Sequence, residues 1–237
     1  AKALEDLNQE LQAALNVKMR FLGKVSHELR SPLCVITGYA NLLADQTFGP
    51  LSAEAAKSVQ RILGQSDGLL SILTYMLEVT QLDAGKLVVK HGPVEIAALL
   101  DQVAAHAARV IGEKPIAFVS DYADCQGLVV TDPQRLVQVL MHLLDNAAKF
   151  TDEGKIVLSA RVENKHLEIA IADTGIGIDA EQQKMIFEGF RQVEESDARR
   201  YDGMGIGLYL VRRLLALLGG EVAVDSKLGE GARFTVR

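Results

Sequence analysis

The chain has 237 residues, 49% of them hydrophobic and 24% charged, and its formal net charge is −6 at pH 7. This acidic balance does not favour nucleic acid as a partner, and the length suffices for one or two domains with their own cores. No apolar run approaches the roughly 20 residues of a membrane span, and no signal peptide is visible. The two cysteines, Cys34 and Cys125, are expected to be small core residues in a reducing compartment. We interpret the chain as a fragment of a longer protein.

Residues 1–86 show the periodicity of two long amphipathic helices. Apolar positions three and four apart predict one helix at residues 4–44, about 60 Å long and bent at Pro32. Residues 45–50 break the pattern, and Ser52 is a plausible N-cap for a second helix. The apolar stripe is wider than a two-stranded seam. An antiparallel hairpin that dimerises into a four-helix bundle would bury the stripes of both helices.

Residues 87–237 alternate between strand-like and helical patterns. Helices are expected at residues 94–111, 133–149, 180–187 and 206–218, and strands at residues 87–90, 116–120, 128–131, 156–162, 167–172, 222–225 and 232–236. Asp132 and Pro133 mark the start of the second of these helices. Helices that interleave with mostly antiparallel strands indicate an α/β sandwich layered on one sheet face. We therefore predict two domains, 1–86 and 87–237, with a hinge at residues 83–86.

A histidine and a carboxylate stand side by side in the first predicted helix, within the sequence SHELRSP of residues 26–32. His27 lies opposite the apolar stripe at 3.6 residues per turn, so its imidazole is expected to face solvent. Glu28 could accept a proton from the imidazole, which attacks phosphorus only when it is neutral. Ser31, one turn further, shares the face of His27. Taken alone, these residues fit an ordinary exposed histidine beside an exposed glutamate, and phosphoryl transfer to His27 is favoured only in combination with the motifs of the second half.

Two glycine-rich segments in the second half suggest a divided nucleotide pocket. Asp173 follows an apolar strand, and its carboxylate could accept a hydrogen bond from an adenine amino group while Gly175 and Gly177 let the backbone approach. The second segment precedes a predicted helix whose N–H groups would hold phosphates; its glycines are Gly203, Gly205 and Gly207. No Gly-Lys-Ser/Thr follows, so it is not a P-loop, and the order of elements does not fit a dinucleotide fold.

The helix expected at residues 133–149 carries polar groups suited to a metal–phosphate complex. Asn146 offers an amide oxygen of the kind that Mg²⁺ accepts, and Lys149, nearly one turn further, could contact phosphate. His142 lies four residues before Asn146 on the same helix face. The remaining histidines have no metal-like partners at usable spacing and are expected at the surface: His91, His106 and His166.

Five motifs in order make nearly all of the chain similar to the core of a two-component sensor histidine kinase. Residues 26–32 resemble the H box, residues 142–150 (HLLDNAAKF) the N box, and residues 173–177 (DTGIG) the first glycine box. Residues 187–190 resemble the F box, and residues 203–207 resemble the second glycine box. The resemblance implies a dimerisation and phosphoacceptor domain followed by an ATP-binding domain of the Bergerat type.

The resemblance also implies roles for individual residues. His27 would be the phosphoacceptor and Glu28 its base, and Ser31 stands where many relatives carry a Thr or Asn that positions water for dephosphorylating the partner. The implied nucleotide-binding residues are Asn146, which would also hold Mg²⁺, Lys149, Asp173, Gly175, Gly177, Phe190, Gly203, Gly205, Gly207 and Thr235. Residues 188–203 would form a mobile lid over ATP. Two further departures from the family are His142, where Asn is usual, and Met204, where Thr is common.

We therefore expect an ATP-dependent histidine kinase that phosphorylates its own His27 and relays the phosphoryl group to an aspartate of a response regulator, which it could also dephosphorylate. The expected cofactors are ATP and Mg²⁺. The expected partners are a second copy of the chain, a receiver domain and an upstream sensor domain in the full-length protein, without nucleic acid. The location would be cytoplasmic, either free or as the cytoplasmic portion of a membrane-anchored sensor.

Two alternatives remain open from the sequence. An ATPase of the gyrase or MutL kind would transfer phosphate only to water, but it needs a carboxylate base where His142 stands. A nucleotide-binding dimeric scaffold, or pseudokinase, would bind ATP without turnover, and the departures at His142 and Met204 are its support.

Overall fold

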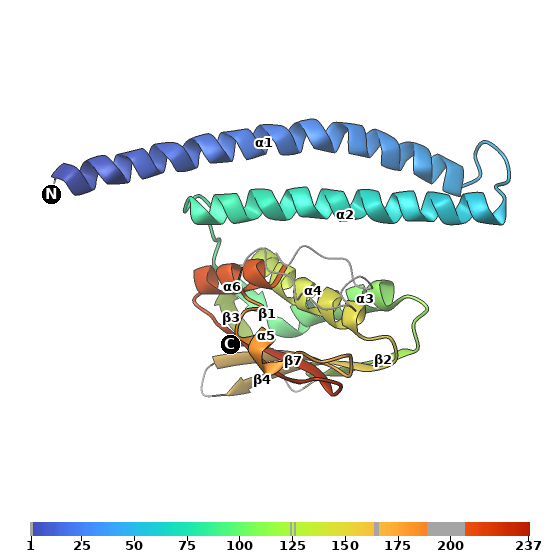
Figure 1. The fold of residues 1–237 in the computed structure, drawn as a ribbon. Helices are drawn as coiled ribbons and strands as arrows, with labels where there is room; N and C mark the ends of the chain where they lie inside the picture. Colours follow the sequence, from blue (N-terminus) through green and yellow to red (C-terminus); the bar gives the residue numbers. More distant parts are fainter. Residues whose placement is uncertain (1, 124, 126, 164–165, 189–206) are drawn as a thin grey trace. The chain divides into compact units, whose positions relative to one another are not determined.

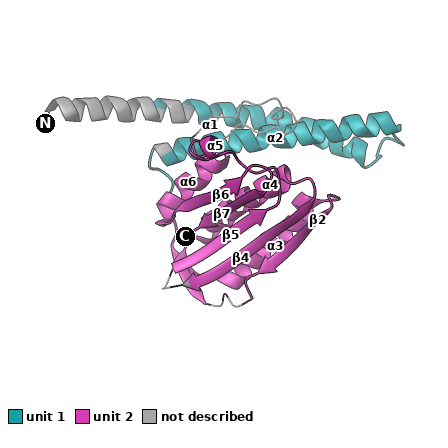
Figure 2. Cartoon of the chain, turned by 60° about the horizontal axis from the view of Figure 1, so that its bottom comes forward, with its two compact units in different colours: residues 1–87 teal, residues 88–237 magenta. Residues whose placement is uncertain are grey.

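The computed structural model describes residues 2–123, 125, 127–163, 166–188 and 207–237. The chain divides into two compact units, residues 1–87 and residues 88–237 (Figure 2). The first is helical, and the second combines helices with strands (Figure 1). This order confirms the predicted fold class of two long helices followed by an α/β fold.

The first unit is a hairpin of α1 (Lys2–Ala44) and α2 (Ala53–Asp83). The Ser52 hydroxyl accepts a hydrogen bond from the Ala55 N–H at 3.2 Å, so Ser52 is the predicted N-cap of α2. The helix α1 continues through Pro32, and Figure 1 shows it curved rather than broken. The buried apolar residues of the hairpin are Leu33, Ala40, Val59, Leu73, Val79 and Leu82.

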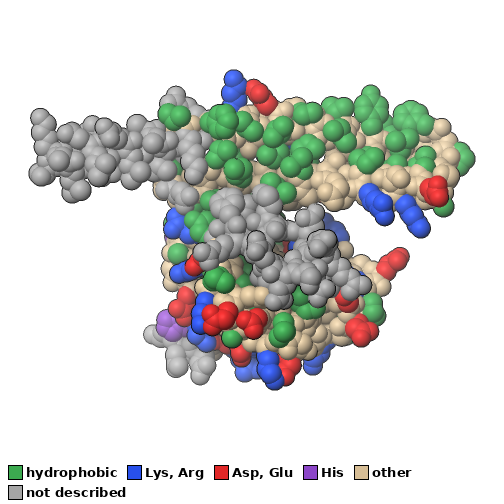
Figure 3. All heavy atoms as spheres, viewed as in Figure 1, with side chains coloured by type: hydrophobic (Ala, Val, Ile, Leu, Met, Phe, Trp, Pro, Cys, Tyr) green, Lys and Arg blue, Asp and Glu red, His purple; other side chains and the backbone are tan. Residues whose placement is uncertain are grey.

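A second apolar stripe of the hairpin is exposed, and Figure 3 shows apolar side chains gathered along these helices. The stripe contains Phe21, Leu29, Ile36, Tyr39, Leu42, Ile62 and Leu69. Cys34 is also exposed, so the expectation of two core cysteines is wrong for Cys34 and holds for Cys125, which is buried. One helical neighbour covers only part of α1, which leaves the rest of its surface open. Among the described residues, no helix is long and apolar enough to cross a membrane.

The second unit contains a five-stranded sheet in the order β2-β4-β5-β7-β6 and a two-stranded sheet, β1-β3. The strands are β1 (Gly92–Glu95), β2 (Ile116–Asp121), β3 (Leu128–Thr131), β4 (Gly154–Glu163), β5 (His166–Asp173), β6 (Val222–Lys227) and β7 (Gly231–Val236). β2 and β4 pair in parallel, and the other described pairs are antiparallel. The helices that cover one face of the larger sheet are α3 (Ile96–Ile111), α4 (Pro133–Phe150) and α6 (Gly207–Leu218), while α5 is a short turn at Ala180–Gln183 (Figures 1 and 2).

The core of this unit lies between the three helices and the sheet. The helix α4 is central, because it contacts α3, α6 and β5. The fully buried large side chains include Leu140, Leu143 and Leu144 of α4, Ile156 and Leu158 of β4, Ile169 and Ile171 of β5, and Leu210 and Leu214 of α6. A helix with neighbours on several sides has one narrow polar stripe left, and on α4 that stripe contains Asn146 and Lys149.

The strand expected at residues 87–90 is absent. Val88 is 74% exposed, and the Lys90 N–H donates to the Asp132 carboxylate at 2.8 Å instead of to a neighbouring strand. Pairing with β3 begins only at Gly92. The apolar residues at 87–89 were therefore a false signal for a strand, because the side chain that caps α4, and not another strand, takes the backbone donor.

Two helices are shorter than expected. β1 occupies the chain up to Glu95, so α3 starts at Ile96 rather than at residue 94. The helix expected at residues 180–187 ends at Gln183, because the regular helical pattern stops there: the N–H groups of both Met185 and Ile186 donate to the Gln182 carbonyl.

Candidate phosphoacceptor and nucleotide-binding sites

Asp132 fixes the N-terminus of α4. Its Oδ1 accepts hydrogen bonds from the Gln134 and Arg135 N–H groups at 3.0 and 3.2 Å, and its Oδ2 accepts one from the Lys90 N–H at 2.8 Å. Burial alone would raise the pKa of Asp132, but these three backbone donors hold it below its usual value. The predicted N-cap is therefore confirmed, and it orients the helix that carries the predicted metal and phosphate residues.

The polar residues of α4 follow one another at helical spacing. Asn146 and Lys149 are partly exposed, and the Lys149 Nζ lies 5.0 Å from the centre of the Phe150 ring, in a cation–π contact. His142, one turn before Asn146, is buried. Burial lowers the pKa of His142, and the charge of Asp145 offsets this only in part. A neutral imidazole therefore occupies this position at neutral pH.

The possible metal ligands on α4 fit a magnesium ion that is also bound by phosphate and water better than a metal ion bound by protein side chains alone. Among the described residues, no group of three or more His, Cys, Asp or Glu side chains could hold a metal ion. Mg²⁺ in phosphoryl-transfer sites commonly takes one or two protein oxygens and completes its shell with phosphate and water. A single amide oxygen such as that of Asn146 is compatible with this mode.

Asp173 ends β5 and is tied to two neighbouring segments. Its Oδ1 accepts hydrogen bonds from the Gly175 N–H at 2.8 Å and from the Ala232 N–H at 3.3 Å. Burial raises the pKa of Asp173, and the two N–H donors offset only part of that effect. Within the described part of the chain, both hydrogen bonds use Oδ1, so Oδ2 remains available to accept a donor from a ligand.

The loop after Asp173 has no room for side chains at its two glycines. A Cβ at Gly175 would overlap the Phe150 carbonyl oxygen, and one at Gly177 would overlap the Lys227 carbonyl oxygen. Gly177 also has a φ of 72°, which favours glycine. The Ile176 N–H donates to the Phe150 carbonyl at 3.2 Å, so the loop is joined to the end of α4. At Gly207, by contrast, a Cβ would meet no described atom within 4 Å.

The structure does not bring Thr235 to Asp173. Phe234 pairs with Ile171, two residues before Asp173, so Phe234 and Asp173 share the core face of the sheet and Thr235 points to the opposite face. Ala232 of β7 reaches the Asp173 carboxylate through its backbone N–H. Sequence reasoning missed it because every residue except proline carries such a donor.

His106 is not the surface residue that the sequence suggested. Its side chain is 14% exposed, its Nε2 lies 2.7 Å from Asp145 Oδ1, and its Nδ1 lies 2.7 Å from an Arg109 nitrogen. Because a guanidinium only donates, Nδ1 is the acceptor and Nε2 carries the proton. These contacts join α3 to α4, next to Asn146 in sequence. The pair spans 39 residues, and no local spacing rule could have predicted it.

The predicted phosphoacceptor face lies on α1. His27, Glu28 and Ser31 are all exposed. The Ser31 hydroxyl donates to the His27 carbonyl at 3.4 Å, and the Glu28 carboxylate lies 3.8 Å from the Lys24 ammonium. An ion pair of this exposure holds its carboxylate weakly, so Glu28 is free to turn toward the imidazole beside it.

Three predicted nucleotide-binding residues, Phe190, Gly203 and Gly205, and also Met204, lie outside the described residues. Of the residues of the F box, the structure describes Phe187 and Glu188. The Phe187 ring packs edge-on against Phe234, with 6.4 Å between the ring centres and 84° between the planes.

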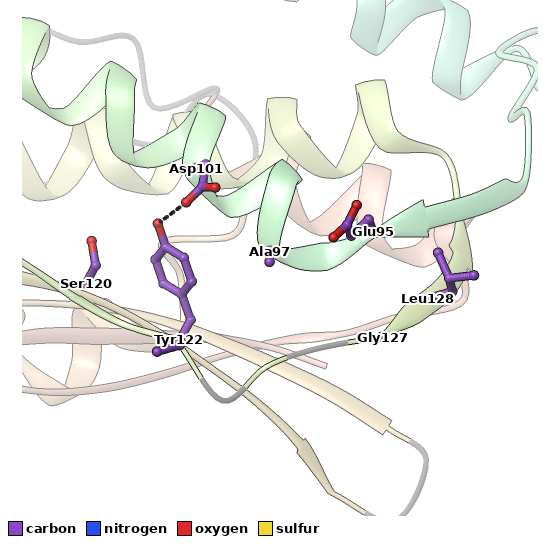
Figure 4. Close-up of a pocket in the computed structure, with 8 residues that line it drawn as sticks. Glu95, Ala97, Asp101, Ser120, Tyr122, Gly127 and Leu128 are labelled. Atoms are coloured by element: carbon purple, nitrogen blue, oxygen red, sulfur yellow. Dashed lines mark hydrogen bonds between the residues drawn. The ribbon is translucent and has the colours of Figure 1, made fainter.

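A separate hollow lies between α3 and the segment that joins β2 to β3 (Figure 4). It has a volume of about 710 Å³, and the Tyr122 hydroxyl on one wall donates to Asp101 at 3.0 Å. None of the residues predicted to bind nucleotide lines it. We therefore do not assign it to the nucleotide site.

Two family models match the chain. Residues 17–85 match the His Kinase A (phospho-acceptor) domain, and residues 131–237 match the histidine kinase-, DNA gyrase B-, and HSP90-like ATPase. Similar curated proteins include the sensor histidine kinase GacS of Pseudomonas protegens, 36% identical, and the signal transduction histidine-protein kinase BarA of Escherichia coli, 32% identical; each match covers 98% of this chain. The chain thus belongs to the sensor histidine kinases.

A solved structure agrees with this membership. Full-length ShkA in complex with AMPPNP is 33% identical to the chain, with a TM-score of 0.74, and the match covers 92% of this chain and 45% of that one. The chain spans 26% of the length of both GacS and BarA.

Proposed function

We propose that this chain is the catalytic core of a sensor histidine kinase, which transfers the γ-phosphoryl group of ATP to His27 and then to an aspartate of a receiver domain. The observation that carries the proposal is the arrangement at Asp173, where a carboxylate oxygen remains available beside a loop that excludes side chains at Gly175 and Gly177. The same chain presents an exposed histidine beside a glutamate on α1.

In this proposal, the second unit binds and orients ATP. Asp173 Oδ2 accepts a hydrogen bond from the adenine amino group, and the tight loop lets the adenine ring lie against backbone. Asn146 holds a magnesium ion through its amide oxygen, and Lys149 leaves the Phe150 ring to contact phosphate. Mg²⁺ supplies neutralisation of the developing charge on the phosphates. Gly203, Gly205 and Gly207 complete the set of phosphate-side residues.

The first unit supplies the nucleophile. A neutral imidazole nitrogen of His27 attacks the γ-phosphorus in line with the leaving oxygen, and ADP departs with the electrons of the broken bond. Glu28 accepts the proton from the other ring nitrogen, or accepts a hydrogen bond from that N–H and stabilises the positive charge that develops on the ring. The exposure of His27 is needed twice, because the ring must meet ATP and later an aspartate of the receiver domain.

We also propose that residues 1–86 form the dimerisation and phosphoacceptor domain, and residues 87–237 the ATP-binding domain. Support for a homodimer comes from the exposed apolar stripe of the hairpin, in which Leu29 and Ile36 keep a seven-residue spacing. The full-length protein would add a sensor domain upstream. It would work on the cytoplasmic side, either free or anchored to a membrane.

A second candidate is a dimeric scaffold that binds nucleotide without turnover. Its support is His142, a buried neutral imidazole at a position where the family usually has Asn. Ser31 keeps a hydroxyl one turn after His27, which supports dephosphorylation of the receiver domain as a further activity.

Incubation with Mg²⁺ and γ-labelled ATP tests the proposal. Wild type should acquire acid-labile, base-stable label, and the His27→Gln variant should acquire none. ATP binding without label on wild type would favour the scaffold. Steady ATP hydrolysis that persists in His27→Gln would favour an ATPase.

A further inference from the structure

Lys114 joins the segment before β2 to the end of α4. Its Nζ donates hydrogen bonds to the carbonyl oxygens of Ala148 at 2.7 Å and of Thr151 at 2.9 Å. The Asp152 carboxylate is 3.9 Å away but largely exposed, so it contributes little. The two carbonyl contacts span 34 and 37 residues of sequence, so they are tertiary contacts rather than a local turn.

The end of a helix needs partners of this kind. The last four carbonyl groups of an α-helix have no N–H partner within the helix, and they carry a partial negative charge. A lysine ammonium brings three donors and a positive charge, and its hydrogen bonds to carbonyls are charge-assisted. The Lys114 side chain is only 36% exposed, so solvent screens these bonds incompletely.

The same turn of α4 is also held by the loop after Asp173. Phe150 lies between Ala148 and Thr151 in sequence, and its carbonyl accepts the Ile176 N–H at 3.2 Å. Gly175 packs against that carbonyl so closely that a side chain could not be added. Two different segments therefore bind carbonyls of one short stretch: Lys114 binds those of Ala148 and Thr151, and Ile176 binds that of Phe150 between them. A shift of this stretch would move the loop that follows Asp173.

We propose that Lys114 is a positioning residue of the ATP site, which holds the end of α4 where Lys149 can meet phosphate and where the Phe150 carbonyl can fix the loop at Gly175 and Ile176. This inference rests on the proposed function, because it assigns the ATP site to these residues. Lys114 itself touches neither of the proposed nucleotide-binding side chains of α4, and it acts through backbone carbonyls.

Three variants of the whole chain test the proposal. Lys114→Met keeps an unbranched side chain but removes the charge and the donors, and Lys114→Arg restores both. Lys90→Met is the matched control, because Lys90 is an exposed lysine of the same unit. Binding of a fluorescent ATP analogue with Mg²⁺ gives the affinity, and His27 phosphorylation gives kcat and the KM for ATP. Amide hydrogen exchange at Ile176, compared with Ile171 inside β5, reports the loop without any nucleotide.

The expected result is a Kd and a KM for ATP raised about tenfold in Lys114→Met, the loss that corresponds to one charge-assisted hydrogen bond, with kcat nearly unchanged. Exchange at Ile176 should rise while exchange at Ile171 does not, and Lys114→Arg should recover most of the affinity. An affinity equal to that of Lys90→Met would overturn the inference. So would faster exchange at both amides, because that pattern means general loss of stability. If wild type binds no ATP, the proposed function fails instead, and the exchange result still reports on Lys114.

Discussion

Replacement of Asp173 by Asn separates nucleotide binding from folding. The Asn Oδ1 can still accept the hydrogen bonds that Asp173 Oδ1 receives from the Gly175 and Ala232 N–H groups at 2.8 and 3.3 Å. The other oxygen becomes an NH₂ group, which donates and cannot accept. An adenine amino group would then face a donor. We therefore expect Asp173→Asn to fold normally and to bind ATP poorly.

The magnitude follows from the lost interaction. A hydrogen bond to a charged group contributes about 1.5–3 kcal/mol, so the Kd for ATP should rise about 10- to 150-fold. The folding stability of Asp173→Asn at neutral pH should be higher than that of wild type, although its ATP binding is weaker. Burial raises the pKa of Asp173, so the folded chain holds this proton more tightly than the unfolded chain, whose ordinary value is 3.8. The stabilising effect of the protonated form is complete below that value and is lost as the pH rises through the folded-state pKa.

The measurements are ATP affinity and thermal unfolding across an acid-to-neutral pH series. Asp173→Asn should become more stable relative to wild type as the pH rises into the neutral range. Asp225→Asn, which removes an exposed carboxylate from β6, is the control for the change in net charge. Unchanged ATP affinity in Asp173→Asn would refute the assignment of adenine recognition. If Asp173→Asn were much less stable than wild type at neutral pH, the buried charge of Asp173 would not destabilise the folded chain as we infer.

Three further predictions concern other parts of the molecule. Gly177→Ala should destabilise the fold by about 1–2 kcal/mol because of its positive φ, and by about 1–3 kcal/mol more because the new Cβ overlaps a backbone carbonyl. Gly219 has a φ of 80° and open space around it, so Gly219→Ala should show only the cost of the positive φ when both variants are unfolded with denaturant. Burial lowers the pKa of His142, so unfolding takes up a proton below the ordinary pKa of about 6.5, and wild type should lose stability there by at most about 1.4 kcal/mol per pH unit. The His142→Asn variant should lack this loss. Acid unfolding curves that run parallel for the two proteins would contradict the prediction. Ile36→Lys, at a residue 48% exposed on the hairpin, should convert a dimer to monomers in sedimentation at micromolar concentration, and an unchanged dimer would exclude this stripe from the interface.

Local chemistry made part of the fold predictable. The helix at α4 was predicted from Asp132, Pro133 and the apolar period, and both the cap and the helix are observed. Residues 128–131 were predicted as a strand and form β3. The false strand at residues 87–90 shows the limit, since an apolar alternation is only a strand when another strand takes its N–H groups.

The parts of the site that depend on tertiary pairing were not predictable. Thr235 was expected from the family resemblance, but its side chain lies on the face of the sheet opposite to Asp173, because successive side chains along a strand point to opposite faces. The backbone N–H of Ala232, the His106 contact and the Lys114 contact all join segments far apart in sequence. The roles assigned to His27, Glu28, Asn146 and Lys149 stay predictions until they are tested by substitution.

Phosphorylation of His27 is tested by locating the phosphoryl group itself. After incubation with Mg²⁺ and ATP, the chain would be digested at neutral to mildly basic pH and sequenced by tandem mass spectrometry, with the His27→Gln variant treated in parallel. We expect one added phosphoryl group on the imidazole of His27, which is lost on brief acid treatment and absent from the variant. A phosphoryl group on another residue, or an equal amount on the variant, would contradict it.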